Sequence, residues 1–589
     1  MFTARTQIAQ SKRLADLANI TQKGISMTDW IEQKESPLNA SRRAALGALA
    51  AGFVGAPALA VNTSSRSKVQ PCSLDRNAVG ELQFSTPSNL VVETASGKVR
   101  GYVVNGIQTF QGMRYAASTA GALRFMPPVK PMPWAGIFDA VYWGNIAPQD
   151  TSADIPGRDF GMMLGWEYGR QNEDCLNLNV WTPSVKPMNK KPVMVWLHGG
   201  GFFEGSSREM PAYHGENLAR TGDVVVVSVN HRLNAFGFLN LSELDATRFK
   251  QSGNVGLLDL VAALEWVRDN IASFGGDPGN VTIFGQSGGG SKVCHLMTSP
   301  LARGLFNKAI VQSGPALRTN TPEESLKVAA RLLATLQIDK ANVDRIMQLP
   351  AGAITLALLD HAGRYGPYLD GEVIPRHPFD PSATPVAAQV PLLIGNCSEE
   401  GAPRAAMDPA ALDMTWEQLQ QNLSKELGEK ARHVIEAFRY AHPASNAQSI
   451  EARINCWRHV PQSLGGMAAN TLALAEIKAA QPSAVYRYVF DYHSKVLDAR
   501  MGCGHNSEHP YVFNNVDRCP ITGGTDESRR VAWQISQAWV SFARTGNPAH
   551  RDIPHWPALT PGQPNAMVFD LEAKTYADFD GEGRRLLVV

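Results

Sequence analysis

A serine flanked by glycines follows a short apolar run near the middle of the chain. Residues 281–286 read Val-Thr-Ile-Phe-Gly-Gln, and Gly285-Gln286-Ser287-Gly288-Gly289 fits the pattern G-x-S-x-G. This pattern predicts a strand that turns directly into a helix, with Ser287 at the turn and in a strained conformation of positive φ. Side chains two positions away would collide there, so Gly285 and Gly289 leave room. We therefore expect the Ser287 hydroxyl to project from the sheet as a nucleophile.

A serine nucleophile needs two partners further along the chain. Its hydroxyl requires a general base, and the base requires a carboxylate that fixes its tautomer. In this arrangement the chain order is serine, acid, histidine. Glu400 follows a buried-strand pattern at 390–395, and His505 follows another at 484–490. The residues alone leave competitors open for both roles, namely Glu399 for the acid and His493, His509 and His459 for the base.

A glycine run offers donors for the charge that develops in such a reaction. Residues 193–197 are apolar and lead into His198-Gly199-Gly200-Gly201-Phe202. Without side chains, the amides of this run can approach a developing oxyanion, together with the amide of Gly288. The sequence thus predicts an oxyanion hole beside Ser287.

The elements that position these residues alternate between strands and helices. Strands are predicted at 91–94, 99–104, 176–180, 193–197, 224–229, 309–313, 390–395 and 484–490. Helices are predicted at 259–271, 322–349, through most of 415–480 and at 529–543. We expect a turn at 275–279 and a surface loop at 148–172 that walls a pocket. The pattern is typical of an α/β fold with a large, mainly parallel sheet covered on both faces.

Composition bounds the partners of the chain. Its 589 residues carry a net charge of +1, from 55 basic and 54 acidic side chains. No basic patch suggests nucleic acid, and no His/Cys cluster has zinc spacing, so we expect neither nucleic-acid binding nor a metal or cofactor. The cysteines number seven, and Cys503 and Cys519 are near enough in sequence to pair.

The N-terminal region has the features of an export signal. Ser41-Arg42-Arg43 precedes a short Ala/Gly/Leu-rich stretch that closes with Ala58-Leu59-Ala60. A basic pair, a short apolar stretch and an A-x-A site predict a twin-arginine-type signal and a periplasmic or secreted protein, without stable membrane insertion after cleavage. We therefore divide the chain into a signal region at 1–60, a linker at 61–88 and a catalytic domain at 89–589.

Several longer motifs identify a family resemblance. Residues 173–181 read Glu-Asp-Cys-Leu-Asn-Leu-Asn-Val-Trp, and further motifs lie at 198–202, 253–259, 274–278, 285–289, 366–371 and 542–548. Together they resemble the type-B carboxylesterase family over about residues 90 to 575. The resemblance implies the α/β-hydrolase fold, with helical insertions that form a cap around an active-site gorge.

The resemblance also selects among the candidate residues. The family's acid is the Glu of an acidic-Glu-Gly triplet, which matches Glu400, and its base is the His of G-x-x-H, which matches His505. Its oxyanion donors match the amides of Gly200, Gly201 and Gly288. The chain departs from the family at Gln286, Gly288, His231 and Asn234, which usually are Glu, Ala, Tyr and Gly.

Other positions receive structural roles from the same resemblance. Arg124 with Glu173, and Arg232 with Asp259, match ion pairs of the family. The usual disulfide partner of Cys175 is replaced by Ala147, which implies a free thiol at Cys175.

The predicted function is hydrolysis of small-molecule carboxylic esters through an acyl-enzyme on Ser287. The same triad would also serve a carbamate or amide hydrolase. An esterase-like binding protein without catalysis is a further alternative. The sequence does not define the acyl or alcohol preference or the oligomeric state.

Overall fold

The architecture was analysed in a computed structural model, which describes residues 83–84, 90–150, 161, 163–359, 365–402, 413–458 and 465–587. All of them belong to the second of two compact units, Asn77–Val589. The predicted signal region 1–60 lies outside the described residues, as does the linker 61–88 apart from strand β1 (Gln83–Phe84). Within the described part of the chain, no helix combines the length and apolar character needed to cross a membrane.

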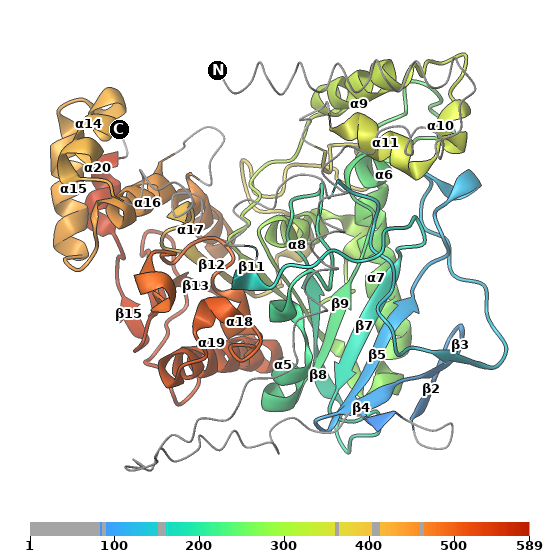
Figure 1. Ribbon diagram of the computed structural model, residues 1–589, viewed down its shortest axis with the longest axis horizontal. Coiled ribbons are helices and arrows are strands. Elements are labelled where there is room, and N and C mark those ends of the chain that lie inside the picture. Colours follow the sequence, from blue (N-terminus) through green and yellow to red (C-terminus); the bar gives the residue numbers. More distant parts are fainter. Residues whose placement is uncertain are drawn as a thin grey trace, which may run out of the picture. The chain divides into compact units, whose positions relative to one another are not determined.

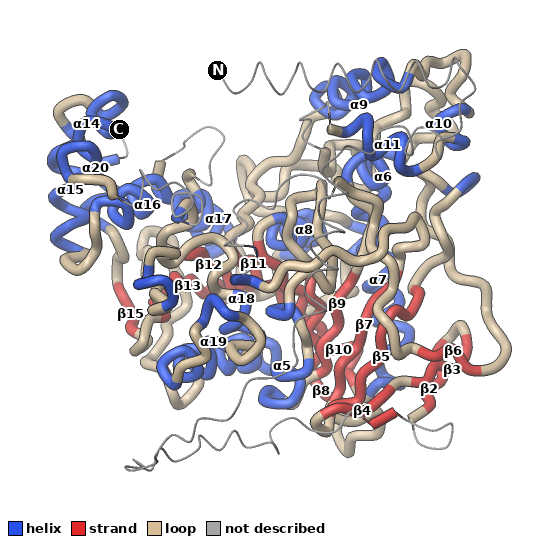
Figure 2. The backbone as a smooth tube through the Cα atoms, in the orientation of Figure 1, coloured by secondary structure: helices blue, strands red, loops and turns tan. Residues whose placement is uncertain are grey.

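A twelve-stranded sheet forms the centre of this unit (Figures 1 and 2). Seven successive strands are parallel: β9 (Val225–Val229), β8 (Lys191–Leu197), β10 (Gly276–Gln286), β11 (Lys308–Gln312), β12 (Leu392–Cys397), β13 (Val485–Phe490) and β14 (Ala566–Phe569). Antiparallel strands extend both sides: β7 (Asn177–Thr182), β5 (Ile107–Arg114), β4 (Tyr102–Val104) and β1 on one, and β15 (Lys574–Tyr576) on the other. A separate small sheet contains β2 (Val91–Thr94), β3 (Gly97–Arg100) and β6 (Ile137–Asp139).

Helices cover both faces of this sheet because alternate strand residues point to opposite faces. On β8, Val193, Val195 and Leu197 pack into one apolar cluster, while Met194 and Trp196 pack into another. The first cluster includes α7 (Val255–Asn270), α8 (Gly288–Thr298) and α17 (Met467–Ala479). The second includes α5 (Glu216–Gly222), α18 (His509–Val512) and α19 (Asp526–Thr545). The predicted parallel sheet between two helical layers is confirmed.

Two groups of helices are inserted after strands of the sheet. One follows β11 and packs with α6 (Asn234–Phe238); it comprises α9 (Pro322–Leu336), α10 (Arg345–Gln348) and α11 (Ala351–Leu358). The other lies between β12 and β13 and includes α14 (Trp416–Leu427), α15 (Lys430–Ala441) and α16 (Ala447–Trp457). Of these, α15 and α16 contact the C-terminal α20 (Gly581–Leu587). Phe202 and Phe203 pack against the first group, so this insertion lies beside the glycine run.

Some predicted boundaries were wrong. Of the turn expected at 275–279, Gly275 has a φ of 84° and ends the preceding 3-10 helix, but residues 276–279 are part of β10, with a register shift between Gly276 and Val281. The helix expected at 322–349 breaks after Leu336, where Gln337 adopts a φ of 55°. Strands β5 and β14 were not predicted, since neither has a long β-branched run.

Other local predictions agree in part. The segment expected to form a single strand at 99–104 is divided at Gly101 between β3 and β4. Of the loop at 148–172, residues 151–160 and 162 lie outside the described part. Its two ends, 148–150 and 171–172, line a cavity together with α11, as expected for a loop that walls a pocket.

Two buried ion pairs tie the connecting segments to the sheet. Arg124 donates to both carboxylate oxygens of Glu173 at 2.7 and 2.6 Å. Arg232 donates in the same way to Asp259 on α7 at 2.8 and 2.6 Å, with exposed side-chain fractions of only 2% and 0%. The predicted structural pairing is confirmed for both.

The Arg232–Asp259 pair predicts a large stability effect. Asp259→Asn should lower the free energy of unfolding by about 3–5 kcal/mol, because it leaves the Arg232 guanidinium buried without a counter-charge. Denaturant unfolding of the purified chain measures this. As a control, Glu436→Gln breaks the exposed Arg432–Glu436 pair of α15 and should leave the unfolding midpoint unchanged. Equal midpoints for wild type and Asp259→Asn would contradict a structural role for the buried pair.

Candidate active site

Ser287 stands at the junction of β10 and α8 in a strained backbone conformation. Its φ and ψ are 56° and −123°, and its amide donates to the Gln312 carbonyl oxygen at 2.8 Å. A Cβ at Gly285 would lie 2.6 Å from the Leu197 carbonyl oxygen, and one at Gly289 would lie 2.0 Å from it. These are backbone contacts that no rotamer change relieves, so the predicted strand–turn–helix and its need for glycine are both present.

His505 and Glu400 meet across 105 residues of chain. His505 Nδ1 lies 2.5 Å from Glu400 Oε2. A carboxylate oxygen can only accept, so Nδ1 carries a proton, and in the neutral imidazole the lone pair is then on Nε2. The other oxygen of Glu400 accepts from the Ser313 hydroxyl at 2.6 Å and from the Cys397 amide at 2.9 Å. The carboxyl group is fully buried and thus held in one orientation.

Ser313 was missed by the sequence reasoning. It follows β11 directly and has a φ of 44°, which turns its hydroxyl toward Glu400. The available signal was its position: the carboxyl ends of adjacent parallel strands lie at one edge of a sheet, and Ser313 directly follows β11, the strand next to β12.

The competing residues lie elsewhere. Glu399 contacts His493 Nε2 at 3.0 Å rather than His505. His509 is fully buried among aromatic rings, with centroids 5.6 Å from Trp196 and 5.1 Å from Tyr213. His459 lies outside the described residues. Among the candidates that the structure describes, the carboxyl group of Glu400 thus lies against the imidazole of His505.

Gln286, the residue before Ser287, contacts His505. Its side-chain amide nitrogen lies 3.3 Å from each ring nitrogen of His505. No hydrogen bond joins Ser287 to His505 among the described residues. Catalytic hydrogen bonds are often long before substrate binds, so this geometry is compatible with proton transfer in a substrate complex.

The amides of Gly200, Gly201 and Gly288 donate no hydrogen bond to any described residue. The amides of Gly201 and Gly288 each share a peptide bond with a carbonyl group that accepts a hydrogen bond. The Gly200 carbonyl oxygen accepts from the Glu204 amide at 3.0 Å, and the Ser287 carbonyl oxygen accepts from the Ser291 amide at 3.0 Å. Because C=O and N–H point in opposite directions across a trans peptide, these bonds fix the directions of the two free amides.

Glycine at 288, where the family usually has alanine, has a local reason. A Cβ there would lie 2.2 Å from the carbonyl oxygen of Gly201 and 2.4 Å from its amide nitrogen. The glycine run therefore approaches the start of α8 more closely than any side chain would allow.

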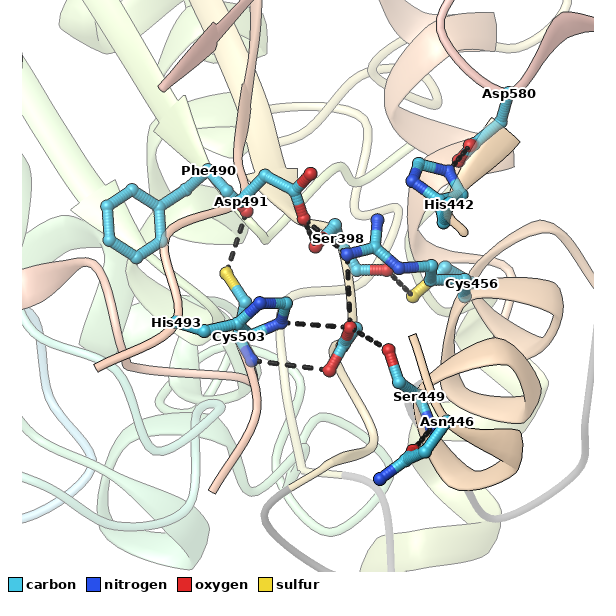
Figure 3. A network of polar contacts seen from close by, with 12 residues as sticks. Ser398, His442, Asn446, Ser449, Cys456, Phe490, Asp491, His493, Cys503 and Asp580 are labelled. Carbon is cyan, nitrogen blue, oxygen red and sulfur yellow. Dashed lines mark hydrogen bonds and ion pairs between the residues drawn. The ribbon is translucent and has the colours of Figure 1, made fainter. Parts of the chain in front are cut away.

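A buried polar network holds the two loops that carry Glu400 and His505 (Figure 3). The amide of Glu399 donates to the Cys503 carbonyl oxygen at 3.0 Å, and the amide of His505 donates to that of Glu400 at 3.1 Å. Arg453 of α16 bridges Glu399 and Asp491, at 3.1 and 2.6 Å. The inserted helices thus help to position the acid and the histidine.

Charge in this network is balanced within it. Burial would raise the pKa of Glu399, but Arg453 and His493 outweigh it and lower the pKa to about 2. Burial would lower the pKa of His493, but Glu399 outweighs it and raises the pKa. Between about pH 4.5 and 6.5, Glu399, His493 and Arg453 are all charged and form a compact ionic cluster beside Glu400.

The cysteines are reduced wherever the structure describes them. Cys503 and Cys519 do not form the disulfide considered from their spacing; the Cys503 thiol instead donates to the Phe490 carbonyl oxygen at 2.8 Å. Cys175 is a buried free thiol, as its missing partner implied.

A cavity of about 610 Å³ opens beside the glycine run. It is bounded by Gly201–Phe203, by Ser291 and His295 of α8, by residues around the start of α9 and by 365–367. A volume of this size suits a small organic molecule rather than a polymer.

A strand–turn–helix serine at the carboxyl edge of a parallel sheet, with a downstream Glu–His pair, defines an α/β-hydrolase. The carboxylesterase family model matches residues 88–583. The chain is 36% identical over 514 residues to the para-nitrobenzyl esterase of Bacillus subtilis, covering 84% of this chain and 98% of that one. It is 34% identical over 496 residues to the phenmedipham hydrolase of Pseudarthrobacter oxydans, covering 81% and 94%.

A solved structure agrees with these relatives. The chain resembles an esterase from Clostridium hathewayi that can hydrolyse aliphatic aromatic polyesters, with a TM-score of 0.74 and 34% identity over 86% of this chain and 99% of that one. The protein belongs to the carboxylesterase family and is a carboxylic ester hydrolase with the α/β-hydrolase fold.

The ionic cluster predicts a bounded pH window for its stabilising effect. His493→Gln should lower the melting temperature most between about pH 4.5 and 6.5, the ordinary pKa values of the two partners. Because the Glu399 pKa is lowered, its contribution is present above 4.5 and is lost as pH falls toward 2. Because the His493 pKa is raised, its contribution is present below 6.5 and is lost as pH rises through the raised value.

Thermal unfolding of wild type and His493→Gln across the pH range measures this window. His433→Gln, which changes an exposed histidine of α15, should show no such pH-dependent difference. A His493→Gln effect that grows steadily into the alkaline range would refute the ion pair with Glu399.

Proposed function

We propose that the protein hydrolyses small-molecule carboxylic esters through an acyl-enzyme formed on Ser287. The Ser287 hydroxyl attacks the ester carbonyl carbon, and His505 Nε2 takes its proton. The electron pair of the carbonyl moves to its oxygen, and the amides of Gly200, Gly201 and Gly288 stabilise that oxyanion. His505 then returns the proton to the departing alcohol.

The second half of the reaction uses the same groups. His505 removes a proton from a water molecule, which attacks the acyl carbon and releases the carboxylic acid and Ser287. Glu400 keeps the Nδ1 proton in place in both halves and stabilises the imidazolium.

The observation that carries this proposal is the 2.5 Å contact between His505 Nδ1 and Glu400 Oε2. It sets the tautomer in which Nε2 is a base, at the edge of the sheet where the strained Ser287 turn also stands. Three amides without internal acceptors at the same edge supply the donors that this chemistry needs.

Labelling of the nucleophile tests the proposal. A fluorophosphonate probe should phosphonylate wild-type protein at Ser287, and pre-incubation with a p-nitrophenyl ester should slow the labelling, as read by peptide mass spectrometry. Ser287→Ala should keep the fold while kcat drops by about 10⁶-fold, because loss of the nucleophile alone removes most of the triad's contribution.

Ser299→Ala provides a matched control. Ser299 is a buried serine at the other end of α8, and its hydroxyl has no hydrogen-bond partner among the described residues. This variant should retain labelling and turnover. Unlabelled but folded wild-type protein would instead support an esterase-like binding protein, and labelling at another serine would refute the assignment of Ser287.

The bond that is cleaved requires a separate measurement. We expect kcat/KM to be highest for the ester in a panel of ester, carbamate and anilide substrates with the same aryl group. The anilide must expel an amine, which leaves less readily than a phenolate, and the nitrogen of the carbamate makes its carbonyl carbon less electrophilic. Faster turnover of the carbamate or anilide than of the ester would favour the alternative hydrolase on the same triad.

A further inference from the structure

A buried lysine lies directly behind the glycine run. Lys292 is on α8, five residues after Ser287, and its side chain is fully buried. Its Nζ donates to the carbonyl oxygen of His198 at 2.8 Å and to that of Gly199 at 3.4 Å. It also lies 5.8 Å from the centre of the Phe202 ring, within the range of a cation–π contact. One side chain thus contacts the run at both ends.

The Gly199 contact determines where the next amide points. The Gly199 carbonyl and the Gly200 amide belong to one planar trans peptide, so they point in opposite directions. With the carbonyl oxygen held toward Lys292, the Gly200 N–H must point away from it. The direction of the Gly200 N–H therefore depends on Lys292, whereas the directions of the Gly201 and Gly288 N–H groups depend on main-chain hydrogen bonds.

The only other described donor to the Gly199 carbonyl oxygen is His198. Its Nδ1 donates at 3.0 Å from the same buried pocket. Its other ring nitrogen has no partner among the described residues. Removal of Lys292 would leave only this bond between adjacent residues to orient the peptide.

Burial of the Lys292 amine costs folding free energy. Burial lowers the pKa of its amine to about 7, against the attraction of the buried Glu209 carboxyl. None of the described carboxylates lies within ion-pair distance of Nζ, and a buried amine without a counter-ion in contact destabilises a fold unless its hydrogen bonds compensate. Such a group at the edge of a reaction site points to a role in the reaction. Both the amine and the ammonium keep N–H donors, so the contact does not require a particular protonation state.

We propose that Lys292 is a positioning residue for ester hydrolysis, which holds the His198 and Gly199 carbonyl oxygens so that the Gly200 amide faces the developing oxyanion. This inference rests on the proposed acyl-enzyme mechanism. It assigns to Lys292 no contact with the substrate.

Transition-state binding separates this role from a purely structural one. Lys292→Met in the full chain should lower kcat for p-nitrophenyl acetate by about 10- to 1,000-fold, up to the cost of one lost oxyanion donor. An aryl trifluoromethyl ketone mimics this transition state. Ser287 Oγ adds to the ketone carbonyl carbon, the proton of the Ser287 hydroxyl passes to His505, and the resulting oxyanion occupies the oxyanion hole. Its inhibition constant should rise by the same factor by which kcat/KM falls.

Lys478→Met is the matched control. Lys478 is also fully buried; it donates to the carbonyl oxygens of Ala387 and Ala388 at 3.2 and 3.3 Å, far along the chain from the glycine run. This variant should lose thermal stability as Lys292→Met does, while kcat and the inhibition constant stay at the wild-type values. If Lys292→Met does not fold, Lys292→Gln, whose amide keeps a donor, is measured in the same way and should show a smaller loss of the same kind.

The outcomes separate the two proposals. Wild-type protein that neither hydrolyses the ester nor forms the hemiketal refutes the proposed function. Active wild type, with unchanged kcat and inhibition constant in the folded Lys292 variant, refutes the positioning role alone. An equal loss of activity in Lys478→Met would also refute it, because the effect would then follow from stability.

Discussion

The backbone of β8 runs so close to the turn after β10 that no Cβ atom fits between them. The Leu197 carbonyl oxygen lies 2.6 Å and 2.0 Å from where Cβ atoms would stand at Gly285 and Gly289. Main-chain atoms in a sheet cannot rotate away, so the contact requires glycine at both positions. It fixes the distance between the serine and the glycine run, and the rest of the site is arranged around that distance.

Several ionisable groups around the candidate site are fully buried, which costs free energy. Burial raises the pKa of Glu209 and of Glu508 to about 8, and burial with the nearby Lys292 lowers that of His198 well below its ordinary value. A folded chain tolerates such groups only when apolar burial elsewhere offsets them. Here the long sheet, with apolar clusters on both faces, supplies that burial.

The helical insertion between β12 and β13 contributes to the site itself. Arg453 from α16 joins Glu399 and Asp491, and the Glu400 amide donates to the sulfur of Cys456 on the same helix at 3.3 Å. The insertion therefore stabilises the loop that carries Glu400. A change in α16 would act on the Glu400–His505 pair through these contacts rather than through access to the cavity.

Much of the fold and part of the site follow from local sequence. Apolar runs such as 193–197 and 224–229 predict buried parallel strands, and the glycines around Ser287 predict the turn, because burial and backbone sterics act over a few residues. The same reasoning misplaced residues 276–279, which are part of β10, and Gln337, which ends α9 with a positive φ. It also left Glu399 and Glu400 undecided until the family motif was considered.

Only the tertiary structure decided which side chains meet. His505 and Glu400 are 105 residues apart, Lys292 and His198 are 94 apart, and Ser313 reaches Glu400 from the neighbouring strand. Local patterns report which face of an element is buried, but they do not report what lies opposite that face. The sequence by itself thus determined most of the parallel strands and the serine turn, and the family resemblance implied the free thiol at Cys175. The register of the parallel strands determined the partners of Glu400, His505 and Lys292.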